Sequence, residues 1–153
     1  MILPETEQLV LRPWFDDDGE AVYKLLKDVH ILPVFGREVL KEKSEGTVFL
    51  KELQQEDSFA LVQKATAKVI GGASLKSENG EGEIVLWIGF PYWRKGCGKE
   101  ALQALLNYGF AEKGLQKITA SCATDNKAAL RLLKGQMQQV REEDGAVFFE
   151  RNK

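Results

Sequence analysis

The residues best suited to chemistry lie in one short stretch near the middle of the chain. There, Gly96 and Gly98 follow an apolar run that favours a β-strand and precede a run that favours a helix. A turn of this kind directs several backbone N–H groups toward one point at the positive end of a helix dipole, which suits a phosphate or pyrophosphate. Arg94, Lys95 and Lys99 add positive charge to the same turn. The stretch therefore predicts a phosphate-binding loop, although a tight turn that binds nothing would use the same glycines.

Two predicted elements hold this loop in place. The apolar run 84–88 favours a strand that ends just before the loop, and the run 100–113 favours a helix that begins just after it. The alternating run 118–122 favours another strand, one whole helix further along the chain. Two strands joined through a helix are usually parallel neighbours. The unit 83–123 is therefore predicted to be a strand, the loop, a helix and a parallel strand.

The N-terminal part of the chain favours one strand followed by two helical regions. The run 8–12 favours the strand, and Asp17 with Glu20 has the spacing of a capping box that starts a helix. A second helical region covers about 38–55, with an interruption near Gly46. The loop between the two helical regions holds many bulky residues, which suits packing or the lining of a pocket.

Three strands joined by short turns come before the loop. The runs 59–62 and 69–75 favour strands, and Asn79-Gly80 is a strong signal for a turn into the run 83–88. Strands that follow one another through short turns predict an antiparallel meander.

The C-terminal part favours a short helix and a hairpin. Asp125-Asn126 caps the helix, Gly135 ends it, and the tail folds back around Asp144-Gly145. The predicted order is therefore β-α-α-β-β-β-α-β-α-β-β. This order indicates an α/β class of fold, with a mixed sheet and helices on its faces.

Composition narrows the classes of protein. The chain has 153 residues, 44% hydrophobic and 29% charged, and we expect one domain over 1–153. A net charge of −2 provides no basic field, so nucleic acid is not an expected partner. Cys97 and Cys122 fit neither a disulfide framework nor a metal site, so we expect a reducing compartment and no metal. The chain shows no signal peptide and no apolar run that would span a membrane, so a cytoplasmic location is expected.

Four motifs in register carry a resemblance to a known family. The run 92–101 reads YWRKGCGKEA where a branch of that family has YWGKGYATEA, and QLVLRP at 8–13 is similar to the first strand of the branch. Val69-Ile70-Gly71 is similar to its third strand, and Asn126-x-x-Ala129 to its late helix. Over nearly its whole length the chain resembles the GNAT superfamily of acetyl-CoA-dependent N-acetyltransferases, in the branch that contains the ribosomal-protein alanine acetyltransferases.

The resemblance implies a fold and a cosubstrate. The fold has a central mixed sheet of about seven strands flanked by about four helices, with the fourth and fifth strands splayed apart. The cosubstrate is acetyl-CoA. The loop would hold its pyrophosphate, while backbone groups at the end of the fourth strand and a side chain from the late helix would hold its pantetheine arm. The cofactor-binding residues implied in this way are Ile88, Phe90, Arg94, Lys95, Gly96, Cys97, Gly98, Lys99 and Asn126.

The same resemblance implies that Glu83 is the catalytic residue, because family members often have an acidic residue at the start of the fourth strand. A carboxylate there can accept the proton that an ammonium group must lose before it attacks a thioester. The alternative is a solvated carboxylate at a strand edge. The lone His30 fits a loop residue better than a base.

Two functions remain open from the sequence. The first is transfer of an acetyl group from acetyl-CoA to a primary amine, in a protein N-terminus or a small molecule, by direct attack in a ternary complex. The second is an acyl-CoA-binding sensor or interaction module with weak or no catalysis. Ala129 and Leu133 motivate the second function, because many relatives have a serine and a thiolate-protonating tyrosine at these two positions. The sequence leaves both a monomer and a homodimer open.

Overall fold

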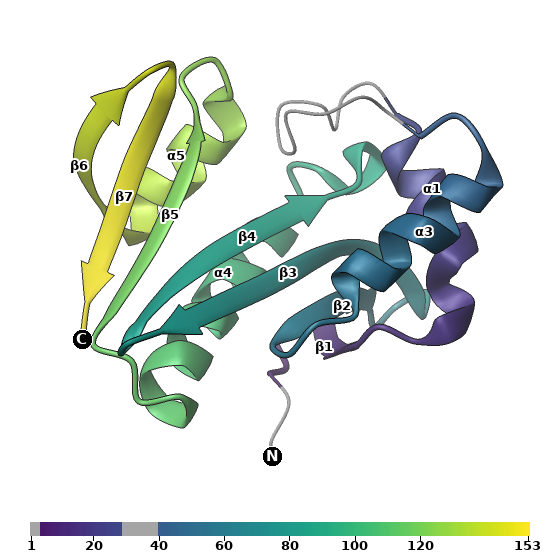
Figure 1. Ribbon diagram of the computed structural model, residues 1–153, viewed down its shortest axis with the longest axis horizontal. Helices are drawn as coiled ribbons and strands as arrows, with labels where there is room; N and C mark the ends of the chain where they lie inside the picture. Colours follow the sequence, from purple (N-terminus) through teal and green to yellow (C-terminus); the bar gives the residue numbers. More distant parts are fainter. Residues whose placement is uncertain (1–3, 29–39) are drawn as a thin grey trace.

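The computed structural model describes residues 4–28 and 40–153, which form a seven-stranded mixed sheet with helices on both faces (Figure 1). The strands are β1 (Leu9–Pro13), β2 (Ser58–Gln63), β3 (Lys68–Glu78), β4 (Glu81–Ile88), β5 (Lys117–Ala123), β6 (Gln138–Glu143) and β7 (Ala146–Asn152). The α-helices in these described ranges are α1 (Gly19–Leu26), α3 (Lys43–Leu53), α4 (Cys97–Asn107) and α5 (Lys127–Gln136). The predicted α/β class and the order of these elements are confirmed. None of the described helices is long and apolar enough to cross a membrane.

The sheet combines an antiparallel meander with a parallel crossover. Its strand order is β1-β2-β3-β4-β5-β7-β6, and only the β4–β5 pair is parallel. Both the meander and the parallel neighbours are as the sequence predicts. Two hairpins turn through consecutive residues with positive φ, at Asn79-Gly80 (52° and 80°) and Asp144-Gly145 (50° and 79°). This geometry matches the right-handed twist of the flanking strands and explains why both hairpins could be predicted from local sequence.

Two hydrophobic clusters lie on opposite faces of the sheet. Helices α4 and α5 cover one face, where Leu105 and Ile118 are fully buried in the larger cluster. Helices α1 and α3 cover part of the other face, where Trp14 stacks on Trp87 with 6.1 Å between ring centroids. Side chains therefore alternate along β4 between the two layers, with Ile84 in the first cluster and Trp87 in the second.

Helix α3 continues through Gly46, which the sequence had predicted to interrupt it. A Cβ at Gly46 would lie 2.6 Å from the carbonyl oxygen of Gly19 and 2.7 Å from Cβ of Tyr23, both in α1. The glycine therefore lets the two helices approach closely, and it does not break the helix. The part of the predicted helical region before residue 40, and the loop that contains His30, lie outside the described residues.

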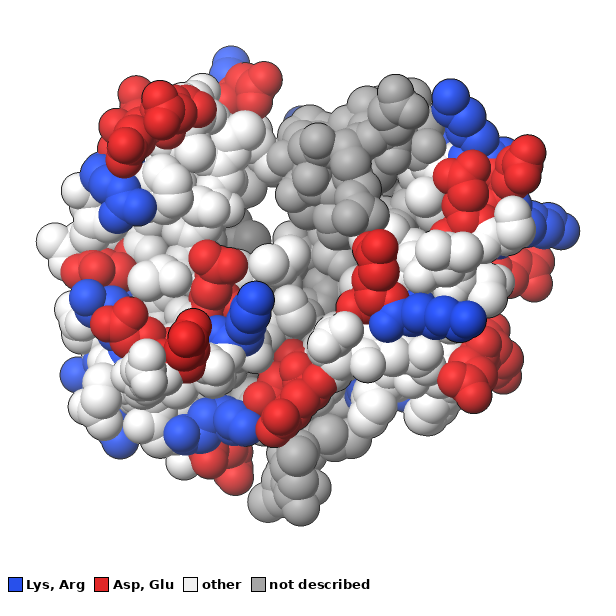
Figure 2. Space-filling model, viewed as in Figure 1, with Lys and Arg blue, Asp and Glu red and all other residues white. Residues whose placement is uncertain are grey.

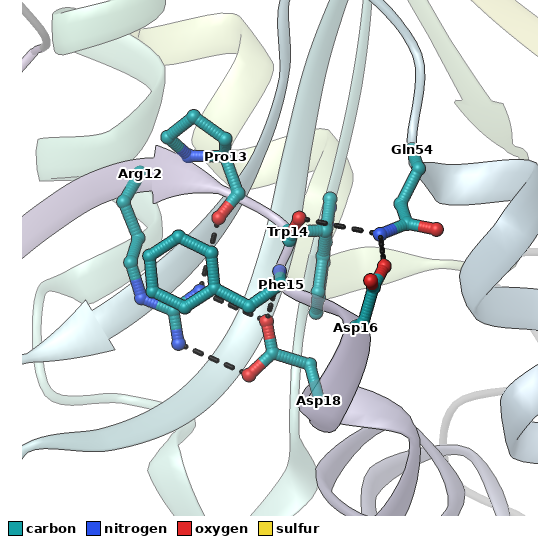
Figure 3. Close-up of polar contacts among 7 residues, drawn as sticks. All are labelled: Arg12, Pro13, Trp14, Phe15, Asp16, Asp18 and Gln54. Carbon is teal, nitrogen blue, oxygen red and sulfur yellow. Dashed lines mark hydrogen bonds and ion pairs between the residues drawn. The ribbon is translucent and has the colours of Figure 1, made fainter.

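Asp18, and not the predicted Asp17, is the N-cap of α1, and its carboxylate bonds back to residues that precede the helix (Figure 3). The Arg12 guanidinium donates two hydrogen bonds to the Asp18 carboxylate, at 2.8 and 3.1 Å, and a third to the carbonyl of Pro13 at 3.0 Å. The N–H of Phe15 donates to the same carboxylate at 2.7 Å. With three acidic residues in a row, the spacing alone did not indicate which one would turn inward.

Two helix ends also differ from prediction. Helix α4 begins at Cys97, three residues earlier than expected, because the left-handed residues of the loop are Arg94 and Gly96. Gly98 therefore lies in the first turn of the helix. Helix α5 runs to Gln136, so Gly135 lies within its last turn and does not end it.

Candidate active site

The start of α4 leaves backbone N–H groups available to a ligand. Gly96 is the N-cap, with φ of 82°, and among the described residues no side chain caps the helix. The first intrahelical bond runs from the N–H of Glu100 to the carbonyl of Gly96 at 3.1 Å. The N–H groups of Cys97, Gly98 and Lys99 come before that bond and have no acceptor within the helix. This is the arrangement that favours an anion, and the helix dipole adds to it.

Backbone conformation, and not space, requires glycine at one of the two glycine positions in the loop. A Cβ at Gly96 would meet only Nε2 of Gln8, at 3.6 Å, but the positive φ there disfavours any side chain. A Cβ at Gly98 would make an ordinary 3.4 Å contact with Leu132. A Gly98→Ala change would thus cost no packing.

Four loop side chains differ in how much solvent they meet. Arg94, Lys95 and Lys99 are exposed, so their positive charges lie at the solvent-facing side of the loop. Cys97 is buried, and burial raises the pKa of its thiol. Cys97 therefore contributes a backbone N–H and packing to the loop, and no reactive thiolate at neutral pH.

Strands β4 and β5 part after a short parallel pairing. Only Glu81, Gly82 and Glu83 of β4 pair with β5, the last of them with Thr119. From Ile84 onward β4 is paired with β3 alone, so one edge of the strand is open. The ribbons diverge there (Figure 1), and the surface is hollowed beside β5 (Figure 2). The splayed strand pair is as predicted.

The open edge of β4 carries a regular set of backbone groups. The N–H of Gly89 donates to the carbonyl of Ile70 in β3 at 2.7 Å, which fixes the parity of the antiparallel ladder. Alternate residues bond to alternate sides, so the N–H and C=O groups of Ile84, Leu86 and Ile88 point away from β3. They point toward the gap. An extended chain lying in the gap could pair with them as an added strand.

Two side-chain bonds agree with this parity and define the ends of the open edge. The hydroxyl of Thr119 donates to the carbonyl of Gly82 at 3.4 Å, where the strands are still paired. The indole N–H of Trp93 donates to the carbonyl of Ile88 at 2.6 Å, where the loop begins. Phe90 lies beyond the strand in a 3₁₀ turn, although it was predicted at the strand end, and its carbonyl accepts from the N–H of Trp93 at 3.2 Å. Sequence reasoning missed Ile84 and Leu86, the other two residues that face the gap. Counting back from Ile88 by the alternation of a strand could have found them.

Glu83 lies at the point where β4 and β5 separate. It is the last β4 residue paired with β5, and its side chain is exposed. By strand alternation it shares a face with Val85 and Trp87, so it lies on the side of the sheet that α1 and α3 cover. The open backbone edge and the Glu83 carboxylate therefore meet at the closed end of the gap.

Asn126 lies at the other side of the gap, at the start of α5. Its side-chain oxygen accepts from the N–H of Ala129 at 3.2 Å, so it is the N-cap that the sequence predicts. Its amide N–H groups remain as donors. Leu133 on the same helix is 6% exposed and belongs to the core. This position of the helix therefore presents an apolar side chain to the core and no ionisable group.

Gln8 and Glu100 form a hydrogen-bonded contact beside the loop that sequence reasoning missed. The Glu100 carboxylate accepts from the hydroxyl of Thr6 at 2.6 Å, from the N–H of Gln8 at 2.9 Å and from the side-chain amide of Gln8. The same amide donates to the carbonyl of Lys95 at 3.1 Å. Burial opposes ionisation of Glu100, but these hydrogen bonds outweigh it and the pKa of the carboxyl is lowered. We call these four residues the clamp.

The site fits acetyl-CoA in three independent respects. The uncapped helix start and its cations suit the phosphates, the open edge of β4 suits an extended amide-bearing arm, and the gap ends at a carboxylate. Among the described residues, no group of three or more His, Cys, Asp or Glu side chains is arranged to hold a metal ion.

Comparisons with known proteins agree with this geometry. The family described as acetyltransferase (GNAT) domain matches residues 8–135. The uncharacterized N-acetyltransferase YoaA of Bacillus subtilis is 28% identical over 138 residues, which cover 84% of this chain and 78% of YoaA. A GNAT-family acetyltransferase from Bacillus anthracis superposes with a TM-score of 0.89 at 21% identity, covering 99% of this chain and 98% of that one. The ribosomal-protein-S5-alanine acetyltransferase from Vibrio fischeri superposes with a TM-score of 0.80 at 17% identity, covering 99% and 97%. At these identities the two structures show a shared fold.

Proposed function

This chain belongs to the GNAT acetyltransferase family, and we propose that it transfers the acetyl group of acetyl-CoA to a primary amine by direct attack in a ternary complex. Membership makes it an acetyl-CoA-dependent N-acetyltransferase. The observation that carries the proposed mechanism is the open edge of β4, which begins just after Glu83 and ends at Ile88, before the loop that leads to the uncapped start of α4. The donor and the acceptor can meet in this gap without a covalent enzyme intermediate.

The proposed roles follow from the placement of each group. Backbone N–H groups at the start of α4 bind the pyrophosphate, and Arg94, Lys95 and Lys99 add charge. Backbone groups of Ile84 and Leu86, together with the Asn126 amide, hold the pantetheine arm so that the thioester lies near the closed end of the gap. One gap-facing N–H can there stabilise the oxyanion that forms when the amine attacks.

Glu83 is the proposed general base. An amine near neutral pH is mostly ammonium, and it must lose a proton before its nitrogen can attack the thioester carbon. Glu83 is exposed at the end of the gap, on the sheet face opposite α4, where an acceptor can approach. The carboxylate accepts this proton directly or through a water. The thiolate of CoA then leaves as the carbonyl re-forms.

The proposed acceptor is defined as a class of molecule, the primary amines. The Vibrio fischeri protein that shares the fold is described as acting on an alanine of ribosomal protein S5, so a panel should include peptides with a free N-terminus beside amino acids, polyamines and aminoglycosides. Release of free thiol from acetyl-CoA is measured with each amine. Binding of acetyl-CoA without turnover of any amine would count against the proposed reaction.

A variant of Glu83 tests the proposed base. Glu83→Gln keeps the shape and removes the proton acceptor, so kcat/KM should fall about 100-fold, and the pH profile should move upward because the amine must then lose its proton to solvent. Glu81→Gln is the matched control, since Glu81 is exposed on the same strand face two residues earlier, where β4 and β5 are still paired. Equal effects of the two variants, or an unaltered pH profile in Glu83→Gln, would remove Glu83 from this role.

A binding module with little catalysis is the second candidate function. The observation that favours it is the buried, apolar Leu133, which cannot protonate a departing thiolate. A free thiol has a pKa of about 8.5, so a thiolate is a tolerable leaving group and an acid is not obligatory. Calorimetry with acetyl-CoA beside the thiol assay separates the two functions, because a sensor would bind acetyl-CoA tightly and turn over no amine.

A further inference from the structure

We infer that the clamp positions the phosphate loop, and that Gln8 is a positioning residue for the CoA half of the donor. This inference rests on the proposed function, because it assigns a task to residues outside the loop that would bind the phosphates. Gln8 precedes β1 and is far from the loop in sequence, since 87 residues separate it from Lys95. Its contacts with the loop therefore exist only in the folded chain.

Gln8 reaches the loop through a single amide group. Its side-chain nitrogen donates to the carbonyl of Lys95 at 3.1 Å and also to the carboxylate of Glu100. Its backbone N–H donates to the same carboxylate at 2.9 Å. The nitrogen also lies nearest to the position that a Cβ on Gly96 would take, at 3.6 Å. One side chain thus bonds to residues on both sides of the helix start, Lys95 before it and Glu100 after it.

The backbone of the loop needs such contacts because it is strained. Arg94 has φ of 64°, a left-handed conformation that is strained for a non-glycine residue. A strained residue persists only when the structure around it holds it in that conformation. Before Arg94, the Trp93 indole is bonded to the carbonyl of Ile88 at 2.6 Å. After it, the Lys95 carbonyl is bonded to Gln8.

The clamp also controls where a negative charge lies. Glu100 is in the first turn of α4, where a carboxylate is attracted by the same helix dipole that would attract a phosphate. Its oxygens accept three hydrogen bonds, all from Thr6 and Gln8. These bonds hold the carboxylate against the N-terminal segment. Without them it would compete with the phosphates for the N–H groups of the helix start.

Gln54 offers a matched control elsewhere in the molecule (Figure 3). Its side-chain amide also donates to one carbonyl and one carboxylate, those of Trp14 and Asp16, at 3.4 and 2.9 Å. It lies at the C-terminal end of α3, and among the described residues its side-chain hydrogen bonds go to Trp14 and Asp16 and not to the loop. The two glutamines therefore make the same kind of bond in different places.

The experiment compares two acetyl donors. Acetyl-CoA carries the phosphates, and S-acetyl-pantetheine carries the same arm and thioester without the pyrophosphate and nucleotide. Gln8→Leu should raise KM for acetyl-CoA about tenfold with kcat little changed, and should leave kcat/KM for S-acetyl-pantetheine as in the wild type. Gln54→Leu should leave KM and kcat for acetyl-CoA, and kcat/KM for S-acetyl-pantetheine, as in the wild type. An equal loss of kcat/KM with both donors would show a general structural defect. No loss with acetyl-CoA would show that the loop keeps its conformation without Gln8. Either result overturns the inference.

A second variant keeps the test independent of folding and turnover. Glu100→Gln should weaken CoA binding in calorimetry, and adding Gln8→Leu to it should cost little more, because residues that act as one unit are not additive. Additive losses would contradict a shared clamp. The proposed function fails in a different way: wild-type protein would then bind no acetyl-CoA, or would bind it and acetylate no amine. Calorimetry still reports on the clamp in the latter case.

Discussion

The two ends of helix α4 are built in opposite ways. At the N-terminal end, Gly96 provides no side-chain cap, and the first N–H groups of the helix have no acceptor within it. The side chains around this end bond to the loop backbone and to one another, as in the contact of Gln8 with Lys95. Contacts from outside the helix fix the conformation of this end, and its first backbone N–H groups stay available to a ligand.

The C-terminal end is closed by side chains. The helix passes into a π-helical turn over Tyr108–Glu112, and the Tyr108 hydroxyl donates to the Asp57 carboxylate at 2.6 Å. Lys113 forms an ion pair with the same carboxylate at 3.0 Å, and the Tyr108 ring meets Phe59 edge to face at 5.6 Å. The Asp57 side chain is only 6% exposed. The polar groups that join this end to the loop before β2 are therefore bonded to one another.

The contrast separates stability from binding within a single helix. Hydrogen-bonded groups that are buried with their partners stabilise the fold, and losing one partner leaves the other unpaired. Groups left unpaired at a helix start lower stability slightly and are available to a ligand. Substitutions at the two ends should therefore have opposite patterns of effect, with binding lost at one end and stability lost at the other.

Gly96→Asp should have the largest effect, and on binding. A carboxylate placed about 5 Å from a phosphate, at an effective dielectric constant of about 20, costs roughly 3 kcal/mol, which corresponds to an affinity for acetyl-CoA about 100-fold lower. Aspartate tolerates a left-handed conformation better than most residues, so the protein should still fold. Calorimetry with acetyl-CoA measures the loss, and circular dichroism checks the fold.

Gly96→Asn is the control for shape. Asparagine has nearly the same volume and the same tolerance of positive φ, but no charge. We expect it to weaken binding only a few-fold. If Asp and Asn weakened binding equally, crowding and not charge would be responsible, and if neither did, this helix end would not be the phosphate site.

Asp57→Asn should have the next largest effect, and on stability. Asparagine can still accept from Tyr108 and tolerates the φ of 56° found here, so the change removes mainly the negative charge opposite Lys113. Losing this largely buried partner should lower the free energy of unfolding by about 2 kcal/mol. Urea unfolding followed by circular dichroism measures it. Affinity for acetyl-CoA should be unchanged, and a matching loss of affinity would break the contrast between the two ends.

The alkaline pH dependence of stability provides the control for this variant. Burial, then the hydrogen bond to Asp57, raises the pKa of Tyr108, and bonding to Asp57 raises the pKa of Lys113. The folded protein therefore holds these protons when the unfolded chain releases them, and stability should fall as the pH rises above about 10. In Asp57→Asn the fall should be shallower. An identical slope in both proteins would mean that Asp57 does not control the two pKa values.

Much of the fold could be predicted from the sequence because its signals are local. The hairpin turns at Asn79-Gly80 and Asp144-Gly145 are encoded by adjacent residues, and the loop at Gly96 is encoded by glycines beside cations. The order of elements follows from periodicity, and the splayed strands came from the resemblance to the GNAT family. These features require no knowledge of which residues meet across the fold.

The features that escaped prediction depend on contacts between distant segments. Gly46 has the local appearance of a helix break, and only its neighbours in α1 show that it permits close packing. The clamp joins Gln8 to Glu100 across 92 residues, so no local spacing indicates it. Local sequence does not distinguish Asp18 from the two acidic residues before it, because its role depends on its bond to Arg12. The roles of Glu83 in catalysis and of the loop in cofactor binding stay predictions that the variants above test.

Arg94→Gly should have the smallest effect. It tests whether binding and stability change in opposite directions at the N-terminal end of α4. Glycine adopts the φ of 64° without strain, and this gain should exceed its entropic cost, so the free energy of unfolding should rise by about 0.5–1 kcal/mol. The exposed guanidinium is lost, so affinity for acetyl-CoA should fall about threefold. Arg94→Asn, which loses the same charge, should match it in affinity and gain less stability. If Arg94→Gly lowered stability, the open end of α4 would hold no backbone strain, and the clamp would have none to oppose.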